Sequence, residues 1–486
     1  MADSKVADSK AADGAGSAAA AKSYDVAIIG AGPGGYVAGI RAGQLGLKAV
    51  VIDRDPNLGG VCLNWGCIPT KALIKNAEMV HFVQDKAESF GIGVQGVTLD
   101  WAKAVDRSRG VVKRMNRGVE GLLRKAGTDV VIGSASVRDA NTVVVAGDAG
   151  EIVITAKSLI IATGSRSRLL PGMTADGERI ITSRHAVKLG EVPKRLLVMG
   201  AGAVGMEFAY VYHAYGADVT VIEMLDRVLP LEDAEASELV AKHFSKSGIR
   251  IKTATKVENV EVTADGVRLT VTPVAGGDSE VLEGDKVLVA IGRAPNTDNL
   301  GLEAVGVALE RGFVKVDDQL RTSVPNIYAI GDVAGPPMLA HKASHEGVQV
   351  MEMLAGLATH SIDASFIPNC TYCQPQVASI GLTEAKAREA GLDIKVSKFP
   401  FIAIAKAVAI AEYDGWVKIV SDAKYGEILG ATIVGPEATE LIHELVLARS
   451  AELTADDLAA AVHAHPTLSE AVHEAALGVG GLPLHI

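Results

Sequence analysis

One pattern, which the sequence contains twice, constrains the fold more than any other feature. In its first copy, the apolar run at residues 26–29 predicts a buried parallel strand, and Gly30-x-Gly32-x-x-Gly35 follows it and opens a helix. A second strand, "KAVVID", ends at Asp53, 23 residues after Gly30. The three glycines permit a tight turn, close approach of a pyrophosphate and helix–strand packing. The pattern therefore predicts a βαβ unit with dinucleotide phosphates at the helix N-terminus and ribose hydroxyls at Asp53.

The second copy has the same spacing, with Gly200-x-Gly202-x-x-Gly205 and Glu223, which again lies 23 residues after the first glycine. A carboxylate at this position favours a free ribose 2′-hydroxyl and repels a 2′-phosphate. No arginine directly follows Glu223, and Arg227, the nearest, is expected to be a surface charge. The second site is therefore predicted to take NAD rather than NADP.

Two adjacent nucleotide sites suggest a flavin that exchanges electrons with a nicotinamide. Three further strand-to-loop exits agree with this, at Thr163-Gly164-Ser165, at Gly292 and at Gly331-Asp332. The Asp332 carboxylate is expected to bond the ribityl or pyrophosphate part of a flavin nucleotide. Taken alone, each exit is an ordinary end of a strand.

Length and composition narrow the class of protein. A chain of 486 residues suggests three or four domains, and its net charge of −11 argues against partners with phosphate backbones or anionic membrane surfaces. No run of eighteen apolar residues predicts a membrane span. Four cysteines do not form a disulfide framework, so a reducing, cytoplasmic location is expected. Residues 1–22 are Ala-rich, repeat "ADSK" and are predicted to be a disordered tail.

Two of the cysteines lie in "GGVCLNWGCIP", at positions 62 and 67. A helix is predicted to begin at Pro69, so its N-terminal field favours the thiolate of Cys67. A zinc site needs about four ligands, and no further Cys or His lies nearby. A structural disulfide stays open as an alternative, but redox chemistry is favoured. Cys370 and Cys373 are expected to be reduced thiols without a role, because a strand pattern rather than a helix follows them.

The segments "GGVCLNWGCIPTKAL", "AIGDVAGPPMLAHKASHEG" and "HAHPTLSEAVHEA" resemble signatures of the pyridine nucleotide–disulfide oxidoreductases, in the expected order over residues 23–486. The resemblance implies an α/β fold with two Rossmann-like dinucleotide-binding domains, for FAD and NAD, and a C-terminal α+β dimerisation domain. It implies a homodimer with shared active sites. The expected boundaries are 23–165 for the FAD domain, 166–295 for the NAD domain, 296–364 for a central segment that completes the FAD site, and 365–486 for the interface domain.

The resemblance also assigns roles to residues. It implies that Cys67 is the thiolate against the flavin and that Cys62 exchanges with a substrate dithiol. His465, oriented by Glu470, is implied as the acid–base residue, acting across the dimer interface. Lys71 and Glu207 are implied to form an ion pair beside the flavin, and His463 and His473 are not expected to take part.

The remaining expected contacts follow from the same motifs. For FAD they are Gly30, Gly32, Pro33, Gly34, Gly35, Asp53, Gly60, Lys71, Thr163, Gly164, Ser165, Asp332, Met338, Leu339, Ala340 and His341. For NAD they are Gly200, Gly202, Ala203, Val204, Gly205, Glu207, Glu223 and Gly292. No metal is expected.

The implied reaction is the oxidation of protein-bound dihydrolipoyl groups with NAD. The implied partner is a lipoyl domain or acyltransferase of a 2-oxoacid dehydrogenase complex, or the lipoyl carrier of glycine cleavage. A glutathione reductase-like activity is the alternative, which Glu223 disfavours, and a mercuric reductase is disfavoured by a C-terminus without a cysteine pair. A catalytically idle FAD-binding scaffold is disfavoured because all four catalytic positions are intact. Trp65 stands where the family more often has a smaller side chain.

Overall fold

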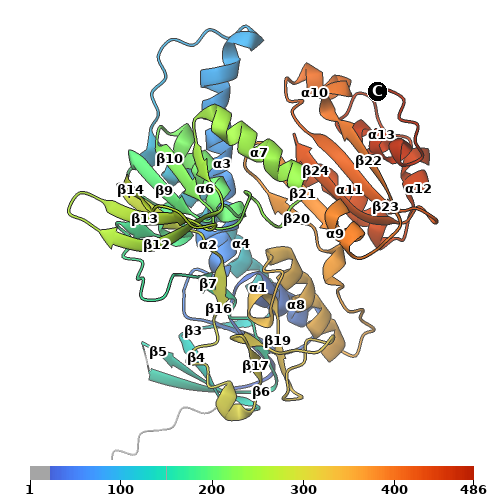
Figure 1. The fold of residues 1–486 in the computed structure, drawn as a ribbon. Helices are drawn as coiled ribbons and strands as arrows, with labels where there is room; N and C mark the ends of the chain where they lie inside the picture. Colours follow the sequence, from blue (N-terminus) through green and yellow to red (C-terminus); the bar gives the residue numbers. More distant parts are fainter. Residues whose placement is uncertain (1–21, 149) are drawn as a thin grey trace, which may run out of the picture.

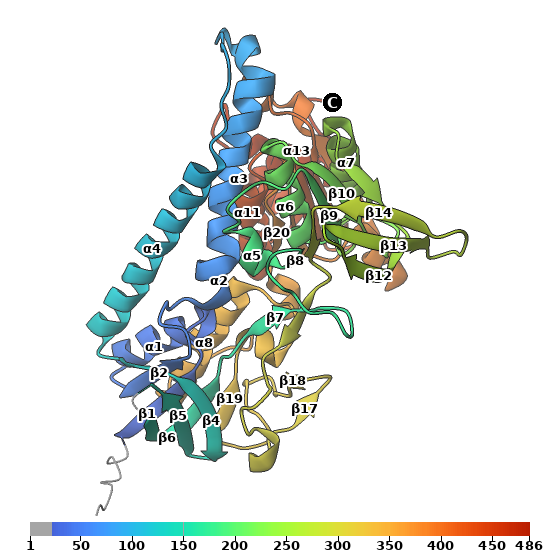
Figure 2. The same cartoon turned by 90° about the vertical axis from the view of Figure 1, so that its left-hand side faces the viewer.

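The structure is a computed structural model that describes residues 22–148 and 150–486. The tail expected at residues 1–22 lies outside the described residues, except for Lys22, which begins the first strand. Figures 1 and 2 show three lobes, with two α/β units one above the other and a C-terminal lobe beside the upper one. No helix in the described part of the chain is long and apolar enough to span a bilayer.

The lower unit is built on a sheet of order β3-β2-β1-β6-β5-β4. Strands β1, β2, β3 and β6 run parallel, while β5 pairs antiparallel with β6 and β4. β19, which lies far along the chain, also pairs with β6, and α8 packs against α1. The bounds are β1 Lys22–Ile29, α1 Pro33–Gln44, β2 Ala49–Asp53, β3 Asp129–Ile132, β4 Ser134–Asp139, β5 Thr142–Gly147, β6 Gly150–Ile161, β19 Ile327–Ala329 and α8 Ala340–Leu354.

The upper unit has a fully parallel sheet of order β11-β10-β9-β15-β8 and a separate antiparallel sheet β12-β13-β14. The pair β7–β16 joins it to the lower unit. The bounds are β7 Ser165–Ser167, β8 Ile180–Ile181, α5 Ser183–Ala186, β9 Arg195–Met199, α6 Ala203–Ala214, β10 Asp218–Ile222, α7 Ala234–Ser247, β11 Arg250–Lys252, β12 Thr255–Val262, β13 Val267–Pro273, β14 Glu280–Gly284, β15 Lys286–Val289 and β16 Arg293–Pro295.

Three helices connect the two units. α2 (Gly60–Trp65) and α3 (Cys67–His81) follow the first βαβ unit, and α4 (Trp101–Ala126) runs back alongside α3 (Figure 2). α3 also packs against α6 of the upper unit, and apolar residues of these helices share one buried core with β9 and β10. The helix expected at Pro69 begins two residues earlier, so Cys67 is its first residue.

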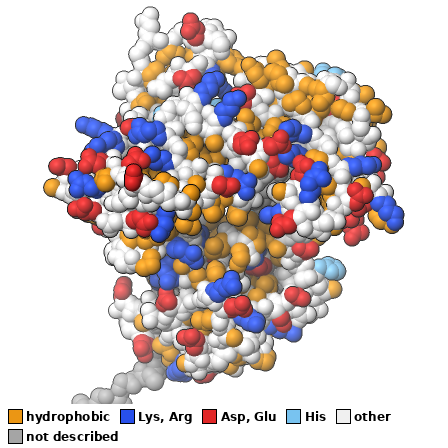
Figure 3. Space-filling view, in the orientation of Figure 1, with side chains coloured by type: hydrophobic (Ala, Val, Ile, Leu, Met, Phe, Trp, Pro, Cys, Tyr) orange, Lys and Arg blue, Asp and Glu red, His pale blue; other side chains and the backbone are white. Residues whose placement is uncertain are grey.

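The C-terminal lobe contains an antiparallel sheet of order β20-β21-β24-β23-β22 with helices packed on it. Its bounds are β20 Asn369–Thr371, β21 Gln376–Gly381, α9 Glu384–Glu389, β22 Ile394–Pro400, α10 Ala405–Ala409, β23 Trp416–Asp422, β24 Ile428–Gly435, α11 Ala438–Ser450, α12 Ala455–Ala460 and α13 Glu470–Val479. Figure 3 shows apolar side chains gathered on the part of this lobe near α10.

Candidate functional site

The first glycine turn leaves space for a ligand at one position and none at another. A Cβ on Gly35 would lie 1.8 Å from the Gly30 oxygen, whereas a Cβ on Gly32 would meet no atom within 4 Å. No side chain caps α1, so its first N–H groups are free to bind an anion. Asp53 Oδ2 accepts the Ala31 N–H at 2.6 Å, which fixes the carboxylate beside the turn. Burial raises the pKa of Asp53.

The second turn repeats this geometry. A Cβ on Gly205 would lie 1.9 Å from the Gly200 oxygen, and Gly202 faces open space. Glu223 Oε2 accepts the Ala201 N–H at 2.7 Å, and Oε1 accepts the Leu225 N–H at 2.9 Å. The two turns therefore form two similar cradles, each with an acid at the end of the second strand.

A cavity of about 730 Å³ opens in front of the second turn. Glu223 lines one part of it, and Gly292 and Arg293 another. Asn369 and Thr371 of the C-terminal lobe line it as well, so two lobes enclose this space. Asn369 donates a hydrogen bond to Glu232, a buried cavity residue whose pKa is raised by burial. These C-terminal contacts could not be read from the local sequence pattern.

Two positive charges near Glu223 are paired with acidic side chains. Arg227 lies 3.6 Å from Asp226, and Lys256, which lines the cavity, is paired with Glu258 at 3.1 Å. Met224, directly after Glu223, is an exposed apolar residue.

The cysteine pair lies at the junction of α2 and α3. Cys62 is partly buried and Cys67 is exposed. The pKa of Cys67 is lowered to about 7, chiefly by a hydrogen bond from Cys62 and also by the charge of Lys71, although burial opposes both. The same hydrogen bond, together with burial, raises the pKa of Cys62. Of the two thiols, the one at the N-terminus of α3 is therefore the more acidic.

Lys71 and Glu207 join the two nucleotide-binding units. Lys71 Nζ lies 2.9 Å from both Oε1 and Oε2 of Glu207, whose side chain is 5% exposed. Although burial lowers the pKa of Lys71, the charges of Glu207 and Cys67 outweigh it, so the pKa is raised. The Tyr372 ring lies 4.2 Å from Lys71 Nζ, and the Tyr372 N–H bonds Glu207 Oε1 at 3.1 Å.

Tyr372 was not predicted as a site residue, because it lies in the segment of Cys370 and Cys373 that was expected to have no role. Burial raises the pKa of Cys370 to about 12, and it raises that of Cys373 as well. Burial therefore disfavours the thiolate form of both cysteines.

The lower unit holds a second network beside Thr163-Gly164-Ser165. Ser165 bonds Asp332, and Arg293 Nε donates to Ser165 Oγ at 2.6 Å. Glu346 Oε2 accepts the Gly331 N–H at 2.6 Å and pairs with buried Lys342 at 2.9 Å. Arg293, Lys342 and Glu346 were not predicted, although two of them stand in a motif that carried the resemblance. The strand end at Asp332 is thereby held in place next to the first cradle.

The start of α8 lies close to this strand end, with Leu339 at its N-cap, Ala340 as its first residue and Met338 just before. His341 Nε2 lies 2.9 Å from the Pro368 oxygen, which ties the helix to the C-terminal lobe. Gly60 contacts the first cradle, since a Cβ there would lie 2.7 Å from the Gly32 Cα.

His465 and Glu470 form a hydrogen-bonded pair in the C-terminal lobe. His465 Nδ1 lies 2.9 Å from Glu470 Oε1, and the Thr467 N–H donates to Oε2 at 2.8 Å. Although partial burial raises it, the net pKa of Glu470 is lowered by these two hydrogen bonds. The His465 side chain is 72% exposed, and Glu470 is its only hydrogen-bond partner in the described part of the chain. Its Nε2 is therefore free to meet a group from outside this chain.

Two neighbouring histidines have other partners. His463 Nε2 bonds Glu444 at 2.6 Å, and the His463 and His473 rings lie 5.1 Å apart. Exposed apolar side chains, among them Val462, Leu447 and Leu482, surround this region of the chain. Such a face is typical of a surface that another chain covers.

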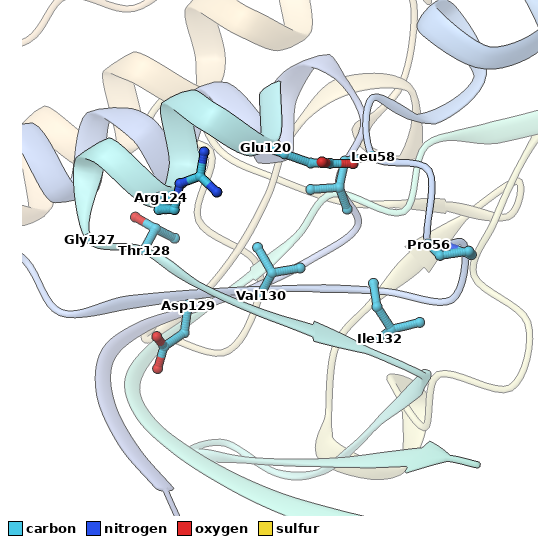
Figure 4. Close-up of a pocket in the computed structure, with 9 residues that line it drawn as sticks. All are labelled: Pro56, Leu58, Glu120, Arg124, Gly127, Thr128, Asp129, Val130 and Ile132. Carbon is cyan, nitrogen blue, oxygen red and sulfur yellow. The ribbon is translucent and has the colours of Figure 1, made fainter. Parts of the chain in front are cut away.

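A second cavity, of about 480 Å³, lies between α4 and β3 of the lower unit (Figure 4). Arg124 and Glu120 of α4 face Val130 and Ile132 of edge strand β3 across it. It contains none of the expected site residues. Among residues 22–148 and 150–486, no group of three or more His, Cys, Asp or Glu side chains is arranged to hold a metal ion.

Comparison with known families gives two matches that together cover most of the chain. Residues 24–347 match the model of the pyridine nucleotide-disulphide oxidoreductases, and residues 367–476 match the dimerisation domain of the same proteins. The second match identifies the C-terminal lobe as a homodimerisation domain.

Individual relatives agree over nearly the whole length. A dihydrolipoyl dehydrogenase of Rhizobium etli is 47% identical over 482 residues, covering 96% of this chain and 100% of the relative. One of Mycobacterium bovis is 48% identical over 462 residues, covering 94% and 98%. Among solved structures, LpdA of Mycobacterium tuberculosis superposes with a TM-score of 0.87 at 29% identity, covering 94% and 99%. The HOCl-induced flavoprotein disulfide reductase RclA of Escherichia coli gives 0.83 at 28% identity, covering 93% and 99%.

Proposed function

Because the chain belongs to the pyridine nucleotide-disulphide oxidoreductase family, we propose that it acts as an FAD-dependent dihydrolipoyl dehydrogenase that reduces NAD. The observation that carries this proposal is the Cys62–Cys67 pair, with one acidic thiol held beside Lys71, in a chain nearly half identical to enzymes of that name.

The residues present fit the two cofactors. FAD would be held by the first cradle, with its phosphates at the N-terminus of α1, its adenosine ribose at Asp53, and the Ser165–Asp332 strand ends along its ribityl chain. NAD would be held by the cavity at the second cradle, with Glu223 at its adenosine ribose. Bound FAD supplies a two-electron acceptor between the dithiol and NAD, which takes up the hydride.

Substrate oxidation runs through the oxidised form of the cysteine pair. A substrate thiolate attacks Sγ of Cys62, the Cys62–Cys67 bond breaks, and Cys67 leaves as a thiolate. Its low pKa and the nearby Lys71 stabilise this leaving group. The second substrate thiol, after losing its proton, attacks the mixed disulfide and releases Cys62. The products are the cyclic lipoyl disulfide and a cysteine pair that carries two electrons.

His465 serves as the base. It accepts the proton of the attacking thiol, while Glu470 holds Nδ1 so that Nε2 faces outward. Its exposure in a dimerisation domain supports contact with the cysteine pair of the partner subunit. The active site is then shared between two chains.

The substrate is a lipoyl group on a carrier protein, either a lipoyl domain or acyltransferase of a 2-oxoacid dehydrogenase complex or the lipoyl carrier of glycine cleavage. The names of the relatives support this. We also propose a cytoplasmic location, because four cysteines in 486 residues do not form a disulfide framework of the kind found in oxidising compartments.

Two assays on the purified protein test the proposal. Dihydrolipoamide with NAD should be turned over rapidly, and oxidised glutathione with NADPH should not. Turnover of the second pair instead of the first would favour the glutathione reductase-like alternative. Bound FAD with no turnover in either assay would favour an idle scaffold.

A further inference from the structure

The helix that carries Cys62 cannot hold its own position. α2 has only six residues, no side chain caps its N-terminus, and Gly66 at its C-terminus has φ −129° and ψ −116°, outside the helical region. Near that end, the Asn64 oxygen accepts a hydrogen bond from Arg109 Nη1 of α4 at 2.7 Å. So short a helix is not stable in isolation. The orientation of the Cys62 thiol therefore depends on how neighbouring groups anchor α2.

One anchor comes from the lower unit. The buried Asn64 side chain donates from Nδ2 to the Asn57 oxygen at 2.8 Å and to the Gly60 oxygen at 3.0 Å, and its Oδ1 accepts from Asn116 Nδ2 at 3.1 Å. These bonds fix one side of α2 against α4 and the preceding loop.

A second anchor comes from the upper unit and acts on Trp65, the last residue of α2. The Arg184 guanidinium lies 4.2 Å from the centre of the Trp65 ring, within the range of a cation–π interaction. Trp65 also packs against the core that α3 shares with the upper unit. Within the described residues, Arg184 makes no ion pair or side-chain hydrogen bond, so this stack is its one specific contact.

Arg184 connects Trp65 to the dinucleotide cavity. It lies on α5, which packs against α2, and the residue before it, Ser183, is buried and lines that cavity. Ser183 in the cavity wall and Arg184, which stacks on Trp65, are therefore neighbours in the sequence.

We propose that Arg184 and Trp65 form a positioning contact that holds the Cys62 thiol in place for exchange with the dihydrolipoyl substrate. Both are positioning residues, because they act on Cys62 through α2. The inference rests on the proposed function for its substrate. The contact itself can be tested without that substrate, through the alkylation rate of the Cys62 thiol.

The test compares Arg184→Gln and Arg184→Lys with the unmodified protein, and uses Arg114→Gln, on the exposed side of α4, as a matched control. An exposed cation–π contact of about 0.5–1 kcal/mol corresponds to a two- to fivefold effect. Arg184→Gln should raise the alkylation rate of Cys62 in the reduced protein about two- to fivefold, as followed by peptide mass spectrometry. It should lower kcat for dihydrolipoamide by a similar factor. FAD content, the KM for NAD and NADH-driven reduction of an artificial acceptor should stay unchanged.

Arg184→Lys keeps the positive charge, so its Cys62 alkylation rate and its kcat should stay close to those of the unmodified protein. Arg114→Gln should change neither quantity. Unchanged Cys62 alkylation in Arg184→Gln would overturn the inference. So would an equal loss of FAD content and both activities, since that would indicate a purely structural role. If the unmodified protein did not oxidise dihydrolipoamide, the proposed function would fail, whereas the alkylation result would still decide the contact.

Discussion

Lys71 of the lower unit and Glu207 of the upper unit form an ion pair, in which Lys71 Nζ lies 2.9 Å from both carboxylate oxygens of Glu207. Lys71 lies four residues after Cys67 on the same helix. The pair therefore links the helix that begins at the acidic thiol to the helix that begins at the second cradle. It also brings a positive charge to the thiolate, which has consequences for how the thiol titrates.

Replacing Lys71 should change the acidity of Cys67. In the unmodified reduced protein, alkylation of Cys67 should rise with pH through a midpoint near 7, because only the thiolate reacts. Loss of a nearby opposite charge raises the pKa, so Lys71→Met should move the midpoint upward by about 1 pH unit or more. Residue-specific alkylation at several pH values measures this.

Lys75→Met is the control for this variant, because Lys75 lies on the same helix but is 60% exposed and paired with Glu78. It should leave the Cys67 midpoint in place. An unchanged midpoint in Lys71→Met would show that the Cys62 hydrogen bond alone sets the acidity of the pair.

His465→Gln should separate the two half-reactions. Lipoamide turnover should fall by roughly 10²–10⁴-fold, the effect of a lost general base. NADH-driven reduction of an artificial acceptor should persist, because it does not require proton transfer from the substrate dithiol. His463→Gln, which removes a neighbouring imidazole bound to Glu444, should leave lipoamide turnover nearly intact. Equal loss of both activities in His465→Gln would assign that histidine a structural role.

Substitution of Gly35 and of Gly32 in the first cradle should affect different properties, the stability of the protein in one case and its FAD affinity in the other. Gly35→Ala would place a Cβ 1.8 Å from the Gly30 oxygen, so the turn must distort and the protein should melt at a lower temperature even without FAD. Gly32→Ala has room for its Cβ within the protein, so the FAD-free protein should melt normally but bind FAD more weakly. Melting curves with and without added FAD distinguish the two. Normal FAD affinity in Gly32→Ala would argue against phosphate binding at this turn.

The preference for NAD should depend on Glu223. A charge-assisted hydrogen bond contributes about 1.5–3 kcal/mol, and an unpaired partner costs a similar amount, so NAD should be preferred over NADP by on the order of a hundredfold or more in kcat/KM. Glu223→Ala combined with Met224→Arg should shrink or invert that ratio. FAD content should not change, because Asp53 serves the other site. Comparable kcat/KM values for NAD and NADP in the unmodified enzyme would refute the role of Glu223.

Local patterns were sufficient to predict the two βαβ units, because each depends on about thirty consecutive residues whose glycines and terminal acid have fixed spacing. Strands β1, β2, β9 and β10 were predicted correctly on that basis. The strand pattern expected after Cys370 and Cys373 corresponds to β21.

These local patterns could not predict contacts between segments that lie far apart in the sequence. Helix α2 was not predicted, since six residues carry no periodic signal and Asn116, fifty-two positions away, holds it through Asn64. Tyr372 was not predicted, because no pattern near it in the sequence indicates that its ring packs against Lys71. The buried Lys342–Glu346 pair has the spacing of an ordinary surface pair on a helix, so only the fold distinguishes it.

The central claim is that Cys62 and Cys67 carry electrons from a dihydrolipoyl substrate toward NAD, and turnover of Cys62→Ser tests it most directly. This variant should bind FAD and still reduce an artificial acceptor with NADH, but its oxidation of dihydrolipoamide with NAD should be abolished, because the substrate thiolate has no sulfur to attack. Full dihydrolipoamide activity in Cys62→Ser would contradict the account.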